Sequence, residues 1–454
     1  MRQKRQEQLN LFHSFGSSDI AKELAEISLL LDASPHVLEH VYLDLIKDCR
    51  IDTGAKGMTA EQVLRAAVLK QYRQLSYREL AFHLEDSNAF RAFTRLEMGC
   101  YPSFSTLQDN IILISSASWK YISDIIIRDA SDAGVENGRK IRVDATSVLC
   151  AILQPSDSSL LRDGVRIITR WLLRGKRFNL PSKYDFADHR RVMKKRYTEI
   201  LNSKKEETRV AAYQDQLKYA RRVCGYAETA LPIIEKAFCK TPEEQAVLDK
   251  LVSKIRNAHA LLMRVINQTE RRVIKKESVP SSEKVTSFFQ SHTDIIVKKN
   301  RETNFGHKVV FTSGSSNLIF DCLMERGNPA DTEQFMTMLE RQKEIFGRMP
   351  RQVAADGGYA SKDNLIKAKE AGIKDVAFSK KRGLSILDMV KSNWVYKQLK
   401  NFRAGIEANI SVLKRAFGLR RCDWSGWEGF QQYVWSAVVS YNLLVLARKR
   451  LKLT

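Results

Sequence analysis

No run of this sequence is apolar for long enough to cross a membrane. It also lacks a signal-peptide start, because residues 1–9 are polar. The seven cysteines are scattered, with none in a C-x-x-C pair, and their odd number argues against a disulfide framework or a zinc site. No internal repeat or low-complexity segment is present. These absences indicate a globular protein with reduced thiols, which we expect in the cytoplasm.

Acidic residues are few relative to basic ones: 52 Asp and Glu stand against 75 Lys and Arg, for a formal net charge of +23. Such an excess favours a polyanionic partner, usually nucleic acid, although a basic, well-solvated surface is the plainer alternative. The charge is spread over the whole chain, which argues against a membrane partner. With 454 residues, of which 44% are hydrophobic, the chain is long enough for two or three globular domains.

Residues 1–135 have helical periodicity and form the first predicted domain. Within 58–96, Thr59 and Ser76 stand where helix N-caps are expected, and Glu79 follows Ser76 at capping-box spacing. Short helices joined by tight turns are typical of a helix-turn-helix DNA reader, but also of a small structural or dimerising bundle. The sequence leaves both roles open.

Residues 155–290 form a second helical segment, which is rich in charge. Across 151–300 there are 31 Lys and Arg against 17 Asp and Glu, so this third of the chain carries +14 of the +23. A charged helix is usually a solvated face, but this imbalance of sign favours contact with phosphates. The densest part includes Lys194, Lys195 and Arg196.

Strand and helix patterns alternate in the rest of the chain. Near residue 139, apolar Ile141 and Val143 begin to alternate with polar Arg142 and Asp144. A meander of three strands followed by two crossover units predicts an α/β mixed sheet covered by helices, with the 155–290 segment inserted between its first two strands. The predicted strands are 139–150, 306–313, 317–324, 350–356 and 374–379, and the predicted helices are 331–346, 361–371 and those from about 391 onward.

The segment NFRAGIEANISVLKRAFGLRRC, residues 401–422, predicts one helix with a lone carboxylate at its border. Its apolar line consists of Ile406, Ile410, Leu413 and Phe417. A second line, about 70° away at roughly 100° per residue, consists of Arg403, Glu407, Lys414 and Arg421.

Three acids stand out by their positions: Asp144 within the first strand, Asp356 at the end of the fourth, and Glu407 on the late helix. Each has an ordinary structural explanation, such as a pair between Glu407 and Arg403 four residues away. Together, carboxylates without His or Cys ligands form an all-oxygen site that suits Mg²⁺ or Mn²⁺. Two such ions about 4 Å apart activate a water and stabilise the leaving oxygen in phosphodiester cleavage.

At these residues the sequence resembles the DDE transposases of bacterial insertion sequences. RVDATSV, AADGGYAS and RAGIEANISVLKRAFG are similar to the three acidic motifs, and the last fits R-x3-E-x6-K through Arg403, Glu407 and Lys414. The stretch LSYRELAFHLEDSNAFRAFTRL resembles the N-terminal helical domain, whereas PSDSSLLRDGVRIITR and HTDIIVKKNRETNFGHKVVF resemble the ISNCY subgroup. The family pattern often has a Tyr three residues before the Arg, where this sequence has Lys400.

The resemblance implies an RNase H-like catalytic domain of residues 136–154 and 291–454, in which Asp144, Asp356 and Glu407 hold two Mg²⁺ or Mn²⁺ ions. It also implies binding of terminal inverted repeats, strand cleavage and transfer into target DNA by a homodimer or higher multimer in the bacterial nucleoid. Alternatives are a metal-dependent nuclease without strand transfer and a transposase-derived DNA-binding regulator. The predicted DNA-binding residues are Arg403, Lys414, Arg421, Lys194, Lys195 and Arg196.

Overall fold

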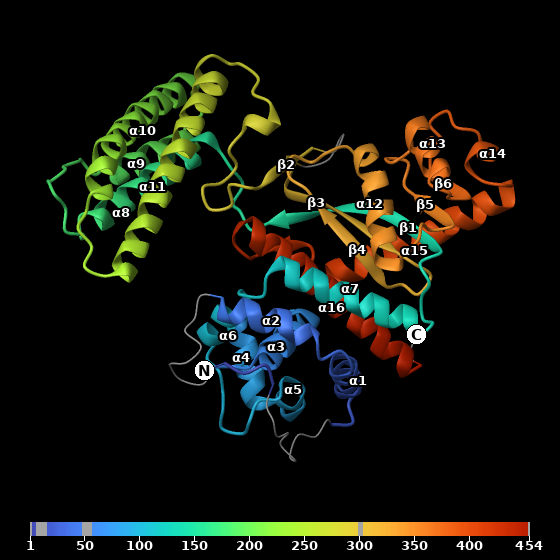
Figure 1. The fold of residues 1–454 in the computed structure, drawn as a ribbon. Helices are drawn as coiled ribbons and strands as arrows, with labels where there is room; N and C mark the ends of the chain where they lie inside the picture. The colour runs from blue at the N-terminus through green and yellow to red at the C-terminus, as the bar shows by residue number, and fades with distance from the viewer. Residues whose placement is uncertain (1, 6–15, 48–56, 298–302, 453–454) are drawn as a thin grey trace. The chain divides into compact units, whose positions relative to one another are not determined.

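The computed structural model divides the chain into two compact units (Figure 1). The first joins Met1–Cys150 to Gly306–Thr454, and the second is Ala151–Phe305. Most of the polar start of the chain and residues 298–302 of the HTDIIVKKNRETNFGHKVVF stretch lie outside the described residues. The structure describes residues 2–5, 16–47, 57–297 and 303–452.

The N-terminal part of the first unit is helical, as predicted. Both predicted N-caps are confirmed: Thr59 begins α3 in a capping box with Gln62, and Ser76 begins α4 in a capping box with Glu79. These boxes satisfy backbone N–H groups at each helix start and thereby fix the tight turn between the two helices. The helices are α1 (Asp19–Ala33), α2 (Val37–Ile46), α3 (Ala60–Arg73), α4 (Tyr77–Asp86), α5 (Asn88–Thr94), α6 (Phe104–Ile111) and α7 (Ser116–Asp132).

A buried charge network joins three of these helices. The Arg65 guanidinium, on α3, is almost fully buried and donates to Asp32 on α1 at 2.8 Å and to Glu61 at 3.1 Å. Arg95, just after α5, binds the same two carboxylates. Arg65 also donates to the Phe93 carbonyl oxygen at 3.2 Å. The more exposed Arg5 lies 3.5 Å from Asp32 and 3.7 Å from Glu61, so three cations, two of them buried, offset the cost of burying two carboxylates.

The first unit also contains a mixed sheet. Strand β1 (Lys140–Cys150) pairs antiparallel with β3 (Asn304–Ser313), and β3 pairs antiparallel with β4 (Ile319–Met324). On its other side β1 pairs parallel with β5 (Gln352–Ala355), which pairs parallel with β6 (Asp375–Phe378). The predicted meander and crossovers are confirmed, and the order β4-β3-β1-β5-β6 puts β1 at the centre.

Helices cover both faces of this sheet. Thr312, which is opposite Val143, contacts Gln342 of α12 (Asp331–Phe346), whereas Arg142 on β1 donates to the Phe402 carbonyl of α15 (Asn393–Ala416). Because successive strand residues point to opposite faces, α12 and α15 lie on opposite sides. The remaining helices are α13 (Lys362–Glu370), α14 (Ile386–Met389) and α16 (Gly426–Arg450).

The prediction of one helix over 401–422 was wrong at its C-terminal end. Helix α15 stops at Ala416, and Gly418 follows with φ +74°, a left-handed conformation that terminates helices and favours glycine. The Tyr433 hydroxyl donates to the Gly418 carbonyl oxygen at 2.8 Å and holds this turn. Arg421 therefore lies in β7 (Arg421–Cys422), which pairs with the end of β1, and not on the helical line of Glu407.

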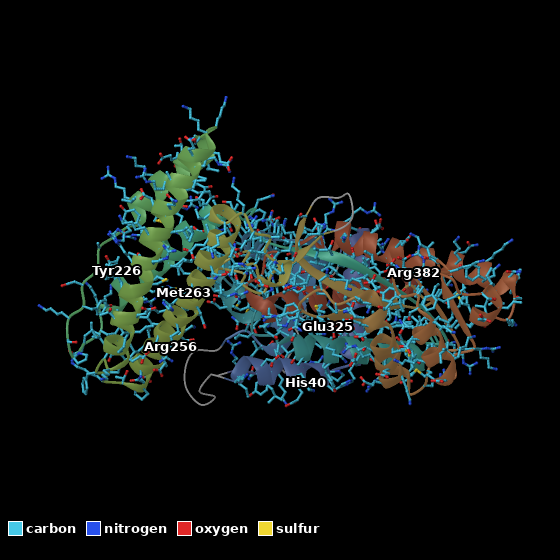
Figure 2. The ribbon with its side chains drawn as sticks, turned by 90° about the horizontal axis from the view of Figure 1, so that it is seen from above. His40, Tyr226, Arg256, Met263, Glu325 and Arg382 are labelled. Atoms are coloured by element: carbon cyan, nitrogen blue, oxygen red, sulfur yellow. The ribbon has the colours of Figure 1, made fainter. Side chains whose placement is uncertain are left out.

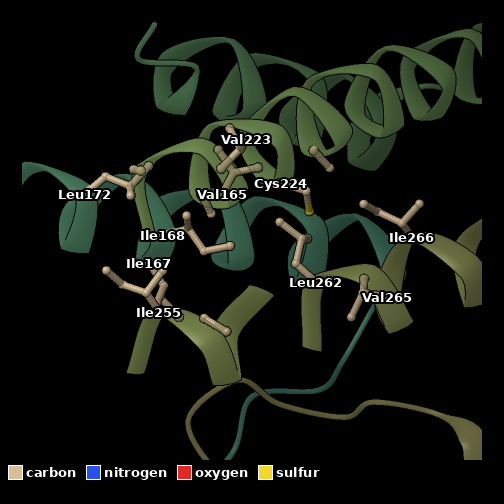
Figure 3. Close-up of a cluster of buried hydrophobic side chains, with 14 of the residues drawn as sticks. Val165, Ile167, Ile168, Leu172, Val223, Cys224, Ile255, Leu262, Val265 and Ile266 are labelled. Atoms are coloured by element: carbon tan, nitrogen blue, oxygen red, sulfur yellow. The ribbon is translucent and has the colours of Figure 1, made fainter. Parts of the chain in front are cut away.

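The second unit is built mainly of helices around its own apolar core, and the predicted 155–290 segment lies within it. Figure 3 shows this core, in which side chains such as Ile168, Val223 and Leu262 come from three different helices. In Figure 2, Tyr226 lies on α10 and Arg256 on α11. The elements are α8 (Asp157–Gly175), α9 (Arg190–Asn202), α10 (Glu206–Glu235), α11 (Pro242–Thr269), η1 (Glu270–Ile274), η2 (Ser281–Glu283) and β2 (Asp294–Ile296).

None of the described helices, in either unit, combines the length and the apolar composition needed to span a membrane.

The buried network yields a stability prediction. Arg65→Ala should lower the free energy of unfolding by about 3 kcal/mol, because it leaves Glu61 and Asp32 with only one nearby buried cation. Urea denaturation followed by circular dichroism measures the loss. Arg73→Ala, which removes an exposed arginine from the same helix, is the control and should cost less than about 0.5 kcal/mol. Equal losses for the two variants would contradict the importance of the network.

Candidate functional site

Two of the predicted acids lie side by side because of strand register. The parallel pairing of β1 with β5 ends at Val143 and Ala355. Asp144 and Asp356 are the next residues after these two paired positions. Asp356 is thus at the carboxyl end of β5, where open α/β sheets place their ligand sites. Positions that are far apart in the sequence are adjacent in the sheet.

The third acid reaches the same place from a helix. Arg403 and Glu407 are one turn apart on α15, and the Arg403 Nη2 donates to the Glu407 carboxylate at 2.7 Å. The other terminal nitrogen, Nη1, lies 3.2 Å from Asp144 Oδ2 and 3.9 Å from Asp356 Oδ1. One guanidinium therefore contacts all three predicted carboxylates, and the structure brings them together.

The Asp144 carboxyl is the most perturbed group of this cluster. Burial raises the pKa of Asp144 to about 6, and the charges of Asp356 and Glu407 act in the same direction. The Ala145 backbone N–H, at 2.8 Å, and Arg403 oppose this rise without cancelling it. A further cation near such a buried carboxyl would stabilise its ionised form.

Asp356 has the opposite environment. Burial alone would raise the pKa of Asp356, but the Ser379 hydroxyl, the Gly357 N–H and Arg403 together lower it. The Ser379 Oγ donates to Asp356 Oδ1 at 2.7 Å and accepts the Gly357 N–H at 2.9 Å. Asp356 is thus held as a carboxylate in one orientation at the end of β5.

The cluster fits a divalent metal. Three carboxylates share one guanidinium, so when all are ionised the site keeps an excess of negative charge. Its donors are oxygen atoms, which Mg²⁺ and Mn²⁺ prefer. The Glu407 side chain is 56% exposed, against 17% for Asp144, so one side of the cluster is open to solvent.

Sequence reasoning missed the residues that fasten α15 to the sheet. The Arg142 guanidinium donates to Ser313 on β3 at 2.7 Å and to the Phe402 carbonyl of α15 at 3.1 Å. A side chain at Gly405 would collide with Arg142, its Cβ falling 1.6 Å from Nη1. The signal was present, because Arg142 alternates on the same strand face as Asp144. The need for glycine at 405 depends on a contact that only the fold reveals.

The other predicted cations lie in different settings. Lys414 is half-buried on α15, and Arg421 is exposed on β7. In the second unit, Lys194 and Lys195 are exposed on α9. Arg196 instead binds Glu199 at 2.7 Å and Asp215 at 2.6 Å, so its charge is already neutralised.

The pKa of Asp144 predicts that removing this carboxylate stabilises the metal-free protein. Because its folded pKa, about 6, exceeds the ordinary 3.8, the stability contributed by the bound proton is complete below about pH 4 and is lost as pH rises through about 6. Asp144→Asn avoids that loss and should gain about 1–3 kcal/mol at pH 8.

Thermal denaturation in EDTA at pH 8 and pH 4.5 measures this gain, which should be clearly smaller at the lower pH, where most of the Asp144 carboxyl in the folded wild type is protonated. Asp388→Asn, at an exposed carboxylate of α14, is the control and should change little at either pH. A gain for Asp144→Asn that is equal at both pH values would show that the buried charge is not its cause.

Models of known protein families match two ranges of this chain. Residues 18–111, which contain α1 to α6, match the family model described as Transposase domain (DUF772). Residues 289–443, which contain Asp356 and Glu407, match the model described as Transposase DDE domain. Asp144 lies outside both ranges. Searches of curated proteins and of solved structures gave no match. With its helical N-terminal region, mixed sheet and clustered acids, this chain belongs to the DDE transposases of insertion sequences.

Proposed function

We propose that this transposase binds the terminal inverted repeats of an insertion sequence, cleaves their strands and joins them to target DNA in a metal-dependent reaction. The observation that carries the proposal is the cluster of three carboxylates around Arg403, inside a chain with a DDE domain. The net charge of +23 supports DNA as the partner.

In this proposal Asp144, Asp356 and Glu407 are the catalytic residues and the metal ligands. Bound there, two Mg²⁺ or Mn²⁺ ions would activate the attacking hydroxyl and stabilise the leaving oxygen of an in-line displacement. Ser379 keeps Asp356 ionised and oriented. Arg403 offsets the repulsion among the acids and is near enough to the open side to contact a phosphate.

The proposed function assigns a role to each of three parts of the chain. Residues 1–135 bind DNA or mediate dimerisation, 136–154 and 291–454 form an RNase H-like catalytic domain, and 155–290 is a basic helical insertion. Lys414, Arg421, Lys194 and Lys195 are the proposed phosphate contacts. Arg196 is a weaker candidate, because two carboxylates already bind it. We expect a homodimer or higher multimer on DNA, in the bacterial nucleoid.

Two other activities compete with this proposal. A nuclease that cuts without joining would use the same carboxylates, and only assays with a target duplex distinguish it from a transposase. A DNA-binding regulator that has lost catalysis needs no convergence of acids. The approach of all three carboxylates to one guanidinium favours catalysis over the regulator.

Glu407→Gln separates catalysis from DNA binding. It keeps the shape of the side chain and removes one negative charge, so cleavage of labelled terminal-repeat DNA in Mg²⁺ should fall by orders of magnitude. Binding of the same DNA, measured by gel shift, should persist or tighten, since a charge that repels phosphate is lost.

Glu340→Gln, at an exposed position on α12, is the matched control and should cleave normally. If Glu407 only pairs with Arg403, the change costs at most about 1 kcal/mol of stability. Wild-type cleavage by the Glu407→Gln variant would therefore remove Glu407 from the active site.

The insertion is tested through salt dependence. If α9 contacts DNA, Lys194→Gln with Lys195→Gln should weaken binding and lower the slope of log affinity against log salt by about two. Lys204→Gln with Lys205→Gln removes the same charge from neighbouring exposed positions and is the control. An unchanged slope would identify Lys194 and Lys195 as ordinary solvated residues.

A further inference from the structure

A polar groove lies within the first unit, where the α3–α4 turn faces the end of α15 and β7. Its cavity measures about 600 Å³. Five of its lining residues are Lys or Arg and two are acidic. The five cations are Lys70, Lys414, Arg415, Arg420 and Arg421.

Two hydrogen bonds connect the walls of the groove and fix the distance between them. The Gln71 amide of α3 donates to the Phe417 carbonyl oxygen at 2.5 Å. The Gln74 amide, in the α3–α4 turn, donates to the Arg415 carbonyl oxygen at 2.8 Å. These bonds use carbonyl groups at the end of α15 that have no partner within the helix. The two walls of the cavity are therefore connected within the folded unit.

One of the cations that line the groove, Lys70, is buried. Its side chain, on α3, is only 6% exposed, and its ammonium lies over the rings of Tyr77 at 4.7 Å and Trp424 at 5.8 Å. Burial lowers the pKa of Lys70, while the charge of Asp423 opposes that effect. No carboxylate within the described residues forms an ion pair with this ammonium. A desolvated cation at the wall of a cavity favours an anionic ligand.

The acidic residues of the groove offset only part of its charge. Glu79 is committed to the capping box of α4, where its carboxylate accepts the Ser76 N–H at 2.7 Å. Arg415 and Arg420 are exposed and form no ion pair among the residues that the structure describes. With five cations against two anions, the groove attracts a polyanion more than a single carboxylate.

The position of the groove relates it to the carboxylate cluster. Lys414 follows Glu407 by seven residues on the same helix, which corresponds to about 10 Å along the axis. Successive nucleotides advance by about 3.4 Å along the axis of duplex DNA, so this distance spans about three nucleotides for a duplex whose axis runs along α15.

We propose that this groove binds the phosphodiester backbone of the DNA strand that flanks the reacting phosphate, about three nucleotides away from it. The proposal rests on the proposed function, because it takes the carboxylate cluster as the place of strand cleavage. Lys70, Arg415 and Arg420 contact phosphate oxygens, and Gln71 and Gln74 fix the distance between the walls. The groove thus sets the register of the strand in the active site.

The first test removes two exposed cations. Arg415→Ala with Arg420→Ala should weaken binding to a duplex that carries the element's end by about tenfold or more at moderate salt, and lower the salt slope by about two. Lys343→Ala with Lys374→Ala removes the same charge from exposed positions outside the groove, and should change affinity less than about threefold. Both double variants should melt like the wild type, because neither breaks an ion pair within the described residues.

The second test locates the contact along the strand. Duplexes in which one phosphate is replaced by a neutral methylphosphonate should bind the wild type most weakly when the change is about three nucleotides from the cleavage position. The Arg415→Ala, Arg420→Ala variant should lose little further affinity on that duplex, since the contact is already absent.

Wild-type affinity and slope for the groove variant, or an equal loss for its control, would overturn the proposal. An additional methylphosphonate loss in the variant as large as that in the wild type would do the same. These failures are distinguishable from failure of the proposed function, in which the wild type itself does not cleave the element's end in Mg²⁺.

Discussion

The contact of Arg403 with three carboxylates is the interaction on which the centre of this protein depends. Without a cation, Asp144, Asp356 and Glu407 would repel one another at the junction of sheet and helix. Arg403 belongs to the same helix as Glu407, so docking of α15 brings the third acid and the counter-charge together. Arg142 secures that docking from the strand side. The position of one helix therefore determines both the geometry and the charge balance of the site.

The net charge of the chain is a poor guide to where DNA binds, because its cations have different tasks. Arg65 and Arg95 form ion pairs in a buried network, and Arg196 binds two carboxylates. Arg403 binds the three carboxylates of the cluster. Cations that face solvent without an acidic partner within the described residues, such as Arg415 and Arg420, are the ones that can attract a phosphate backbone. Structure is needed to separate these classes.

Local signals in the sequence were sufficient for most elements. The caps at Thr59 and Ser76 and the strand alternation around Asp144 depend on a few neighbouring residues, and the structure confirms each of these predictions. The end of α15 was misjudged because Phe417 continued the apolar period, whereas the left-handed conformation of Gly418 ended the helix. A two-residue strand such as β7 has too few residues for any periodicity.

The site was predictable in its acids but not in their surroundings. Asp144, Asp356 and Glu407 could be chosen from their positions in the predicted topology. Ser379 is a neighbour of Asp356 only because β5 pairs in parallel with β6, and Arg403 reaches the strands only when α15 is docked. Such contacts depend on register and packing, which a single sequence does not encode in any short pattern. Whether the cluster holds metal is still a prediction.

The packing of α16 has a consequence for the order in which the chain acquires its structure. This helix lies beside α7, in red next to the pale blue-green of that helix, and also packs against α1 and α3 (Figure 1). During synthesis those three helices emerge long before α16. The apolar faces that pack against α16 are therefore uncovered until a helix more than 290 residues downstream has been made. The N-terminal bundle therefore cannot complete its core until α16 has been synthesised, so its folding depends on a contact of long sequence separation. Nascent chains that stall before α16 should be recognised by chaperones rather than accumulate as folded, DNA-binding fragments.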